Sequence, residues 1–153
     1  MNLSQQSLKE IIQAYREALA EPLDLPMWVR LTLAFFEHHP EPAWIKAVMP
    51  GDTQTQMIRV NRAYQEQVGV SLEEYQGHAD NSVWDNFTTD SFALHDQEAI
   101  DKRSPVRTVE YSTNPITKVR QRWISWKWPV ILDGHVVAVC GCAVLDAGYD
   151  GSE

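Results

Sequence analysis

The sequence offers few groups that could perform chemistry, and the histidines are the first to consider. The five histidines stand at positions 38, 39, 78, 95 and 135. None has a second histidine or a cysteine three or four residues away, the spacing that places two metal ligands on one helical face. His38 and His39 end a predicted helix, where cationic side chains are favoured. The sequence therefore predicts no metal site.

Acidic residues are dense between positions 80 and 101. Carboxylates spread in this way over a helical region are typical of helix N-caps and of a solvated helix face. No Ser–His–Asp order, glycine-rich phosphate loop or nucleophile elbow accompanies them. We therefore expect that the protein is not an enzyme. The aspartates in question are Asp80, Asp85, Asp90, Asp96 and Asp101.

Charge and cysteine content exclude several classes of partner. A formal net charge of −8 opposes binding to nucleic acid, which requires a basic face. No apolar run is long enough for a membrane span, and the first 20 residues do not read as a signal peptide. Cys140 and Cys142 are two apart in one predicted strand, near the upper distance limit for a disulfide, so we expect free thiols and a cytoplasmic location.

The strongest structural signal is a hairpin over residues 119–145. Two apolar runs meet at Asp133-Gly134, a pair typical of tight hairpin turns because glycine adopts positive φ without strain. The first run carries Trp123, Trp126 and Trp128, which together have too much apolar surface to remain in water. Other parts of the chain, or a partner, must cover this hairpin.

Further elements precede the hairpin. Apolar spacing predicts an amphipathic helix over residues 4–20 and a helix over 26–37 that is apolar nearly all round. Strands are predicted at 43–49, 56–60 and 106–112, with capped helices between the last two. In that interval, Asn61 caps one helix, Ser71 to Glu74 form a capping box, residues 82–87 form a helical turn, and Asp90 caps a helix that ends at Arg103.

This order predicts an α+β fold with a five-stranded antiparallel sheet. The helices of the central region cover one face of the sheet. The other face requires the N-terminal helices or a dimer interface to cover it.

Five motifs in this order and spacing resemble the PAS domain family over residues 42–146. Many members end on an Asp-Ile-Thr-like triplet that leads to an output domain, whereas here Leu145-Asp146-Ala is followed by few residues. The resemblance therefore implies a free-standing PAS-type sensor, with an N-terminal extension over residues 1–41 and a flexible tail over 147–153. The motifs are Pro42 to Lys46, Val60 to Tyr64, Gly69 to Gly77, Lys127 to Val130, and Asp133-Gly134 with Gly141 downstream.

The resemblance also implies a small pocket between the sheet and the central helices. Members of the family use it for haem, flavin, small organic acids or nothing. His95 is the eligible haem residue, although a solvated helix histidine explains it as well. Flavin photochemistry is not expected, because residues 78–84 hold no cysteine. Pocket candidates are Asn61, Tyr64, Trp84, Phe87, Trp123, Ser125 and Gly141; satisfied core polar groups are the alternative explanation for Asn61 and Ser125.

Strand alternation assigns the two faces of the hairpin. The family pattern puts Trp123, Ser125 and Lys127 toward the pocket and leaves Trp126 and Trp128 on an outer apolar patch. Counting from the turn puts Gly141 inward and both cysteines outward, although counting from Asp146 gives the reverse. Predicted interface residues are Ile11, Tyr15, Trp28, Phe35, Trp126 and Trp128.

Two functions follow as hypotheses. One is a sensory module that binds a small ligand in the pocket. The other is an interaction domain with a filled core that forms a homodimer or docks to a separate output protein. A third alternative is a cavity-containing α+β protein that binds or transforms a small molecule, and it predicts ordered acid/base pairs in the cavity.

Overall fold

The computed structural model describes residues 27–48 and 55–152 and divides the chain into two compact units, Met1–His39 and Pro40–Glu153. In the first unit, α2 (Met27–Glu37) forms where the apolar helix is predicted. The predicted helix at 4–20, with Ile11 and Tyr15, lies outside the described residues. No helix within the described ranges is long and apolar enough to cross a membrane.

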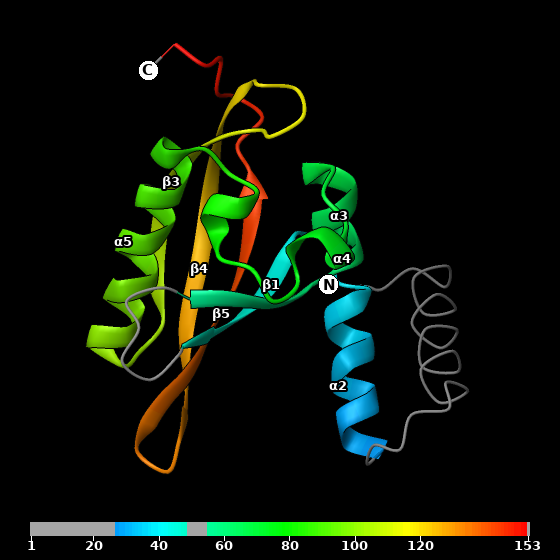
Figure 1. The fold of residues 1–153 in the computed structure, drawn as a ribbon, viewed down its shortest axis with the longest axis vertical. Coiled ribbons are helices and arrows are strands. Elements are labelled where there is room, and N and C mark those ends of the chain that lie inside the picture. The colour runs from blue at the N-terminus through cyan, green and yellow to red at the C-terminus, as the bar shows by residue number, and fades with distance from the viewer. Residues whose placement is uncertain (1–26, 49–54, 153) are drawn as a thin grey trace, which may run out of the picture. The chain divides into compact units, whose positions relative to one another are not determined.

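The second unit is built on one antiparallel sheet of five strands in the order β2-β1-β5-β4-β3 (Figure 1). The three C-terminal strands form a meander, and β1 pairs with the far side of β5. The predicted five-stranded antiparallel α+β fold is confirmed. The strands are β1 (Ala43–Val48), β2 (Thr55–Val60), β3 (Val106–Thr113), β4 (Arg120–Leu132) and β5 (His135–Leu145).

The helices between β2 and β3 begin at side chains that cap their first turns. Asn61 accepts a hydrogen bond from the Tyr64 N–H at the start of α3 (Arg62–Val68), and Gly69 ends this helix with φ of 85°. Ser71 and Glu74 form the predicted capping box of α4 (Leu72–Tyr75). The 3₁₀ helix η1 (Asp80–Ser82) and α5 (Asn86–Lys102) follow, and α5 packs against β3, β4 and β5.

The start of α5 differs from the prediction. Asp85, and not Asp90, is the N-cap, since its carboxylate accepts the Thr88 N–H at 2.9 Å. The Thr88 hydroxyl in turn accepts the Thr113 N–H of β3 at 2.9 Å, which ties this first turn to the sheet. Phe87 therefore belongs to α5, and the separate turn predicted at 82–87 is replaced by η1. Asp85 and Asp90 are equally good caps by residue type, and the contact with β3 favours the earlier one.

The hairpin has the predicted turn and the predicted faces. Asp133 and Gly134 have φ of 50° and 79°, and β4 pairs with β5 from Leu132 and His135 onward. Gly141 faces inward under Trp44, where a Cβ atom would lie 2.4 Å from the indole ring. Gly141 therefore faces inward as predicted, with Cys140 and Cys142 half-buried on the opposite face. The register shifts between Val130 and Ile131, so the pairing does not run unbroken from the turn.

An aromatic core lies between the sheet and the helices. Trp44 of β1 meets Tyr64 of α3 edge-on at 6.1 Å, and Tyr64 meets Tyr75 in the same way. The Trp123 indole donates to the Ser112 hydroxyl at 2.9 Å, which satisfies its polar atom inside this core. This packing leaves the inward face of β1, β3 and β4 as the wall of the candidate site.

Candidate functional site

Two lysines point from the sheet into the core, which is unusual because an ammonium group must be paired when it is buried. Lys46 shares the inward face of β1 with Trp44, and Lys127 shares the inward face of β4 with Trp123 and Ser125. The side chains of Lys46 and Lys127 are only 3% and 1% exposed. Strand alternation places both lysines opposite η1 and α5.

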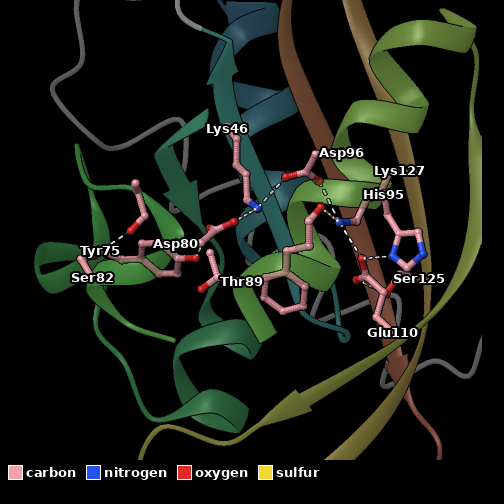
Figure 2. A network of polar contacts seen from close by, with 12 residues as sticks. Lys46, Tyr75, Asp80, Ser82, Thr89, His95, Asp96, Glu110, Ser125 and Lys127 are labelled. Atoms are coloured by element: carbon pink, nitrogen blue, oxygen red, sulfur yellow. Dashed lines mark hydrogen bonds and ion pairs between the residues drawn. The ribbon is translucent and has the colours of Figure 1, made fainter. Parts of the chain in front are cut away.

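Each lysine is held between two carboxylates (Figure 2). Lys46 Nζ donates to Asp80 of η1 at 2.6 Å and to Asp96 of α5 at 2.9 Å. Lys127 Nζ donates to the other oxygen of Asp96 at 2.7 Å and lies 2.7 Å from Glu110 of β3. Asp96 therefore joins the two lysines into one continuous network.

The two ends of the network are closed by neutral or titratable groups. At one end, the Tyr75 hydroxyl donates to Asp80. At the other end, Glu110 accepts the Ser125 hydroxyl at 3.1 Å and contacts His95 Nδ1 at 2.9 Å (Figure 2). The contacts of the network follow the order Tyr75, Asp80, Lys46, Asp96, Lys127, Glu110 and His95. Negative and positive groups alternate from Asp80 to Glu110, so the charged part of the network begins and ends with a carboxylate.

The pairing keeps these groups charged despite their burial. Burial lowers the pKa of Lys46, but the charges of Asp80 and Asp96 outweigh it and raise that pKa above its ordinary value. Burial likewise opposes ionisation of Asp96, yet Lys46 and Lys127 lower its pKa to about 2. The pKa of Glu110 is lowered by Lys127 and His95 against the effect of burial. Tyr75 stays neutral, because burial, Tyr64 and Asp80 raise its pKa well above the ordinary value.

The space left between these side chains is small. The cavity has a volume of about 30 Å³, room for about one or two water molecules, whereas ligand pockets measure roughly 300–1,000 Å³. The ammonium groups of Lys46 and Lys127 lie 5.4 and 5.3 Å from the centre of the Phe92 ring. The chain's own cations therefore occupy the aromatic pocket.

Four of the seven predicted pocket residues line this cavity: Tyr64, Trp84, Trp123 and Ser125. Asn61 is fully buried as the α3 cap and also joins Ala43 and Glu41. Phe87 lies at the surface under the Arg120 guanidinium, 3.9 Å from its ring centre. Gly141 makes room for Trp44 and does not face the cavity.

The sequence interpretation missed the charged residues of the site. Asp80 and Asp96 are not solvated caps but buried partners of lysine, so that part of the prediction is wrong. The ordered acid/base pairs expected of a cavity protein exist, although they are locked together around a cavity too small for a substrate. Strand alternation was the available signal, because it places Lys46, Glu110 and Lys127 on inward faces.

The structure places His95, the eligible haem residue, on α5 beside the buried network. Its Nδ1 lies 2.9 Å from Glu110 and its side chain is 18% exposed, so it is not simply a solvated histidine. The cavity beside the two lysines, which His95 does not line, has no room for a porphyrin. Among the residues that the structure describes, no group of three or more His, Cys, Asp or Glu side chains is arranged to hold a metal ion.

The opposite face of the sheet is apolar and exposed. Trp126 and Trp128 of β4 are 39% and 38% exposed, and Trp126 lies beside Arg107, whose guanidinium is 5.7 Å from its ring centre. In the next row across the strands, Ile124 pairs with Val109 of β3 and Val144 of β5. We call this set of six residues the outer face.

The remaining predictions concern the cysteines, helix α2 and the C-terminal tail, each taken by itself. Burial raises the pKa of the Cys140 thiol to about 11 and that of Cys142 above its ordinary value, with a contribution from Glu41, so both are protonated, weak nucleophiles. Of the predicted interface residues on α2, Phe35 is 65% exposed, and Trp28 lies in the first turn. Tyr149, in the predicted tail, packs edge-on against Tyr111 of β3.

Comparison with known proteins decides the family. The family model described as PAS fold matches residues 36–144, well over half of the chain. The chain belongs to the PAS-fold family. PAS domains are generally signal-sensing modules, and this coarse function applies to the present chain. No curated protein matches it in sequence.

Solved PAS structures share the fold at low sequence identity. The LOV protein of Rhodobacter sphaeroides matches with a TM-score of 0.61 and 9% identity over 95% of this chain and 72% of that chain. The PAS domain from Colwellia psychrerythraea matches with a TM-score of 0.65 and 11% identity over 80% of this chain and 99% of that chain. The PAS domain of BvgS from Bordetella pertussis matches with a TM-score of 0.59 and 16% identity over 81% of this chain and 90% of that chain. These similarities concern the fold alone.

Proposed function

We propose that this PAS-type protein relays a signal by protein–protein interaction, with the outer face as its homodimer interface. The observation that carries the proposal is the exposure of two tryptophans at the centre of an apolar sheet face. Aromatic residues at the centre of a patch are typical hot spots of interfaces. The PAS pocket is filled by paired charges, which favours interaction over the binding of a large cofactor.

A second copy of the chain is the partner that best matches this surface. A two-fold interface brings the same patch of both subunits together, so the patch must complement itself. The outer face meets this condition, because its centre is apolar and its Arg107 lies against its own Trp126. At its edge, Arg122 is neutralised by Asp146 at 2.7 Å.

The test is the double substitution Trp126→Ala with Trp128→Ala. An interface tryptophan contributes roughly 2 kcal/mol or more, so we expect dimerisation to weaken by at least about a hundredfold. Sedimentation velocity over a concentration series measures this change. Leu94→Ala is the matched control, since Leu94 is 67% exposed on α5, away from the outer face. A wild-type monomer throughout the series, or a double variant with unchanged assembly, contradicts the proposal.

A second candidate function is the sensing of a very small ligand. Trp44 is one of the residues that line the cavity, and its Nε1 is buried with no hydrogen-bond partner within the described part of the chain. A buried donor of this kind favours an acceptor of a few atoms. Native mass spectrometry of the purified protein, combined with an absorbance spectrum, is the test. A retained small molecule at one per chain supports sensing, whereas an apo dimer contradicts it.

A further inference from the structure

The hairpin of β4 and β5 is longer than the sheet that holds it. β3 pairs with β4 only as far as Lys127, and β1 pairs with β5 only as far as Ala138. Beyond these residues, β4 and β5 continue to pair with each other up to the turn. Residues 128–137, which we call the arm, therefore form a two-stranded ribbon without a neighbouring strand from the described part of the chain (Figure 1).

The arm is apolar although much of it is exposed. Ile131, Leu132 and Val137 are each more than a third exposed, and Leu132 is 59% exposed. Exposed apolar patches mark surfaces that another molecule covers, and a two-stranded ribbon is only marginally stable by itself. One contact holds the tip: the Arg103 guanidinium at the end of α5 donates to the Gly134 carbonyl at 2.9 Å. The arm is therefore positioned before any partner binds.

One apolar row joins the arm to the outer face. Alternation along β4 places every second side chain on the side of Trp126 and Trp128. The register shift near the arm leaves Val137 of β5 as the extra residue, so the alternation of β4 is not interrupted. We call this set the β4 row, and Trp128 is its middle. Its members are Ile124, Trp126, Trp128, Val130 and Leu132.

The outer face needs the arm to reach the area of a stable interface. Such an interface buries roughly 800 Å² on each partner. Trp126 and Trp128 are 39% and 38% exposed, so together they offer about 200 Å² of a tryptophan surface of up to about 250 Å² each. The arm is the exposed apolar surface that continues the outer face along β4.

The two ends of the β4 row differ in height above the sheet. At the Arg122 end, Tyr149 lies on the outer side, edge-on to Tyr111 at 5.6 Å and 5.0 Å from the Arg122 guanidinium. The other end is the tip of the arm. A two-fold axis along the strands would bring the two raised ends together and hold the sheets apart. An axis across the strands instead brings each raised end to the partner's arm.

We infer that two copies pack outer face to outer face with their β4 rows antiparallel, about a two-fold axis beside Trp128, so that each arm covers the far end of the partner's row. The inference rests on the dimer proposed above and gives it a geometry. Residues equally far from the axis exchange contacts. Trp126 then faces the partner's Val130, and Ile124 faces the partner's Leu132.

The test places opposite charges at two positions that face each other in this arrangement. Ile124→Lys and Leu132→Glu are made separately in the whole chain, and sedimentation velocity measures each variant and their equal mixture. Each variant alone should dimerise at least about a hundredfold more weakly than the wild type, because the interface then buries unpaired charges. The mixture should recover a dimer, since the new ammonium group of one copy meets the new carboxylate of the other.

Two further variants complete the design. Leu94→Glu is the control for Leu132→Glu, because Leu94 is 67% exposed on α5, and it should assemble like the wild type. If Ile124→Lys does not fold, Trp126→Lys mixed with Val130→Glu asks the same question one step nearer the axis.

The outcomes separate this geometry from the proposed dimer itself. A mixture that stays monomeric, or a Leu132→Glu protein with unchanged assembly, overturns the inference. The proposed function survives that result if Trp126→Ala with Trp128→Ala still weakens the wild-type dimer. A wild-type monomer throughout the concentration series overturns both.

Discussion

At the scale of single residues, Asp96 is the member of the buried network that binds both lysines. Its two oxygens accept from different lysines, so it holds β1 and β4 to α5 at one point. Removing one member of a buried ion pair is more damaging than the pair itself is stabilising, because the other charge remains buried without a partner. Loss of the Asp96 carboxylate would remove a partner from both Lys46 and Lys127.

Asp96→Asn should therefore destabilise the protein strongly. We expect a loss of roughly 3–5 kcal/mol in the free energy of unfolding, the range for a broken buried pair, measured by urea denaturation. Asp90→Asn changes the same chemical group on an exposed part of the same helix, and a surface change of this kind costs about 0.5 kcal/mol or less. Equal losses in both variants would show that the network does not stabilise the fold.

At the scale of elements, the position of Trp44 depends on a glycine in the neighbouring strand. Gly141 pairs with Trp44 across β1 and β5, and the indole lies against its Cα. The same ring lies 5.9 Å from the Lys127 ammonium group, so the glycine indirectly positions one wall of the site. A side chain at position 141 would displace this wall.

Gly141→Ala tests this packing. The new Cβ would lie 2.4 Å from the Trp44 ring, and overpacking of this kind costs about 1–3 kcal/mol. Thermal unfolding and the near-ultraviolet circular dichroism of tryptophan report the effect. In Gly148→Ala the nearest atom is Asp146 Oδ1 at 3.4 Å. That variant should unfold close to the wild type, and a Gly141→Ala protein that does likewise would refute the close approach.

At the scale of the whole molecule, the network joins the sheet to the helices that cover it. Asp80 connects η1 to β1, while Asp96 and Glu110 connect α5 and β3 to β4. The opposite face of the same sheet presents Trp126 and Trp128, both more than a third exposed. One sheet therefore separates a charged core from an apolar surface.

This arrangement predicts sensitivity to acid. The folded pKa of Asp96 is about 2, below the unfolded value of about 3.9, and the pKa of Glu110 is also lowered. Both contribute stability above their unfolded pKa values, and this stability is lost as the pH falls through the folded values. Far-ultraviolet circular dichroism should show acid unfolding between about pH 4 and about pH 2. Asp96→Asn should show a shallower fall in stability over that range, and an unchanged acid slope would speak against this assignment.

Much of the fold could be predicted from local patterns. The Asp133-Gly134 turn, the caps at Asn61 and Ser71 and the alternation of β4 each depend on neighbours in the sequence, and the structure confirms them. Asp85 and Asp90 show the limit of such patterns, because both are good caps and only the contact of Thr88 with β3 distinguishes them.

The sequence by itself determined that Lys127 shares a face with Trp123 and Ser125, since alternation along a strand is a local property. It did not determine that Asp80 and Asp96, 34 and 50 residues from Lys46, would bind its ammonium group. An aspartate on a helix has the same local pattern whether it caps, faces water or pairs in the core. Only the tertiary structure decides, because the partner that makes burial of the carboxylate favourable comes from a distant strand.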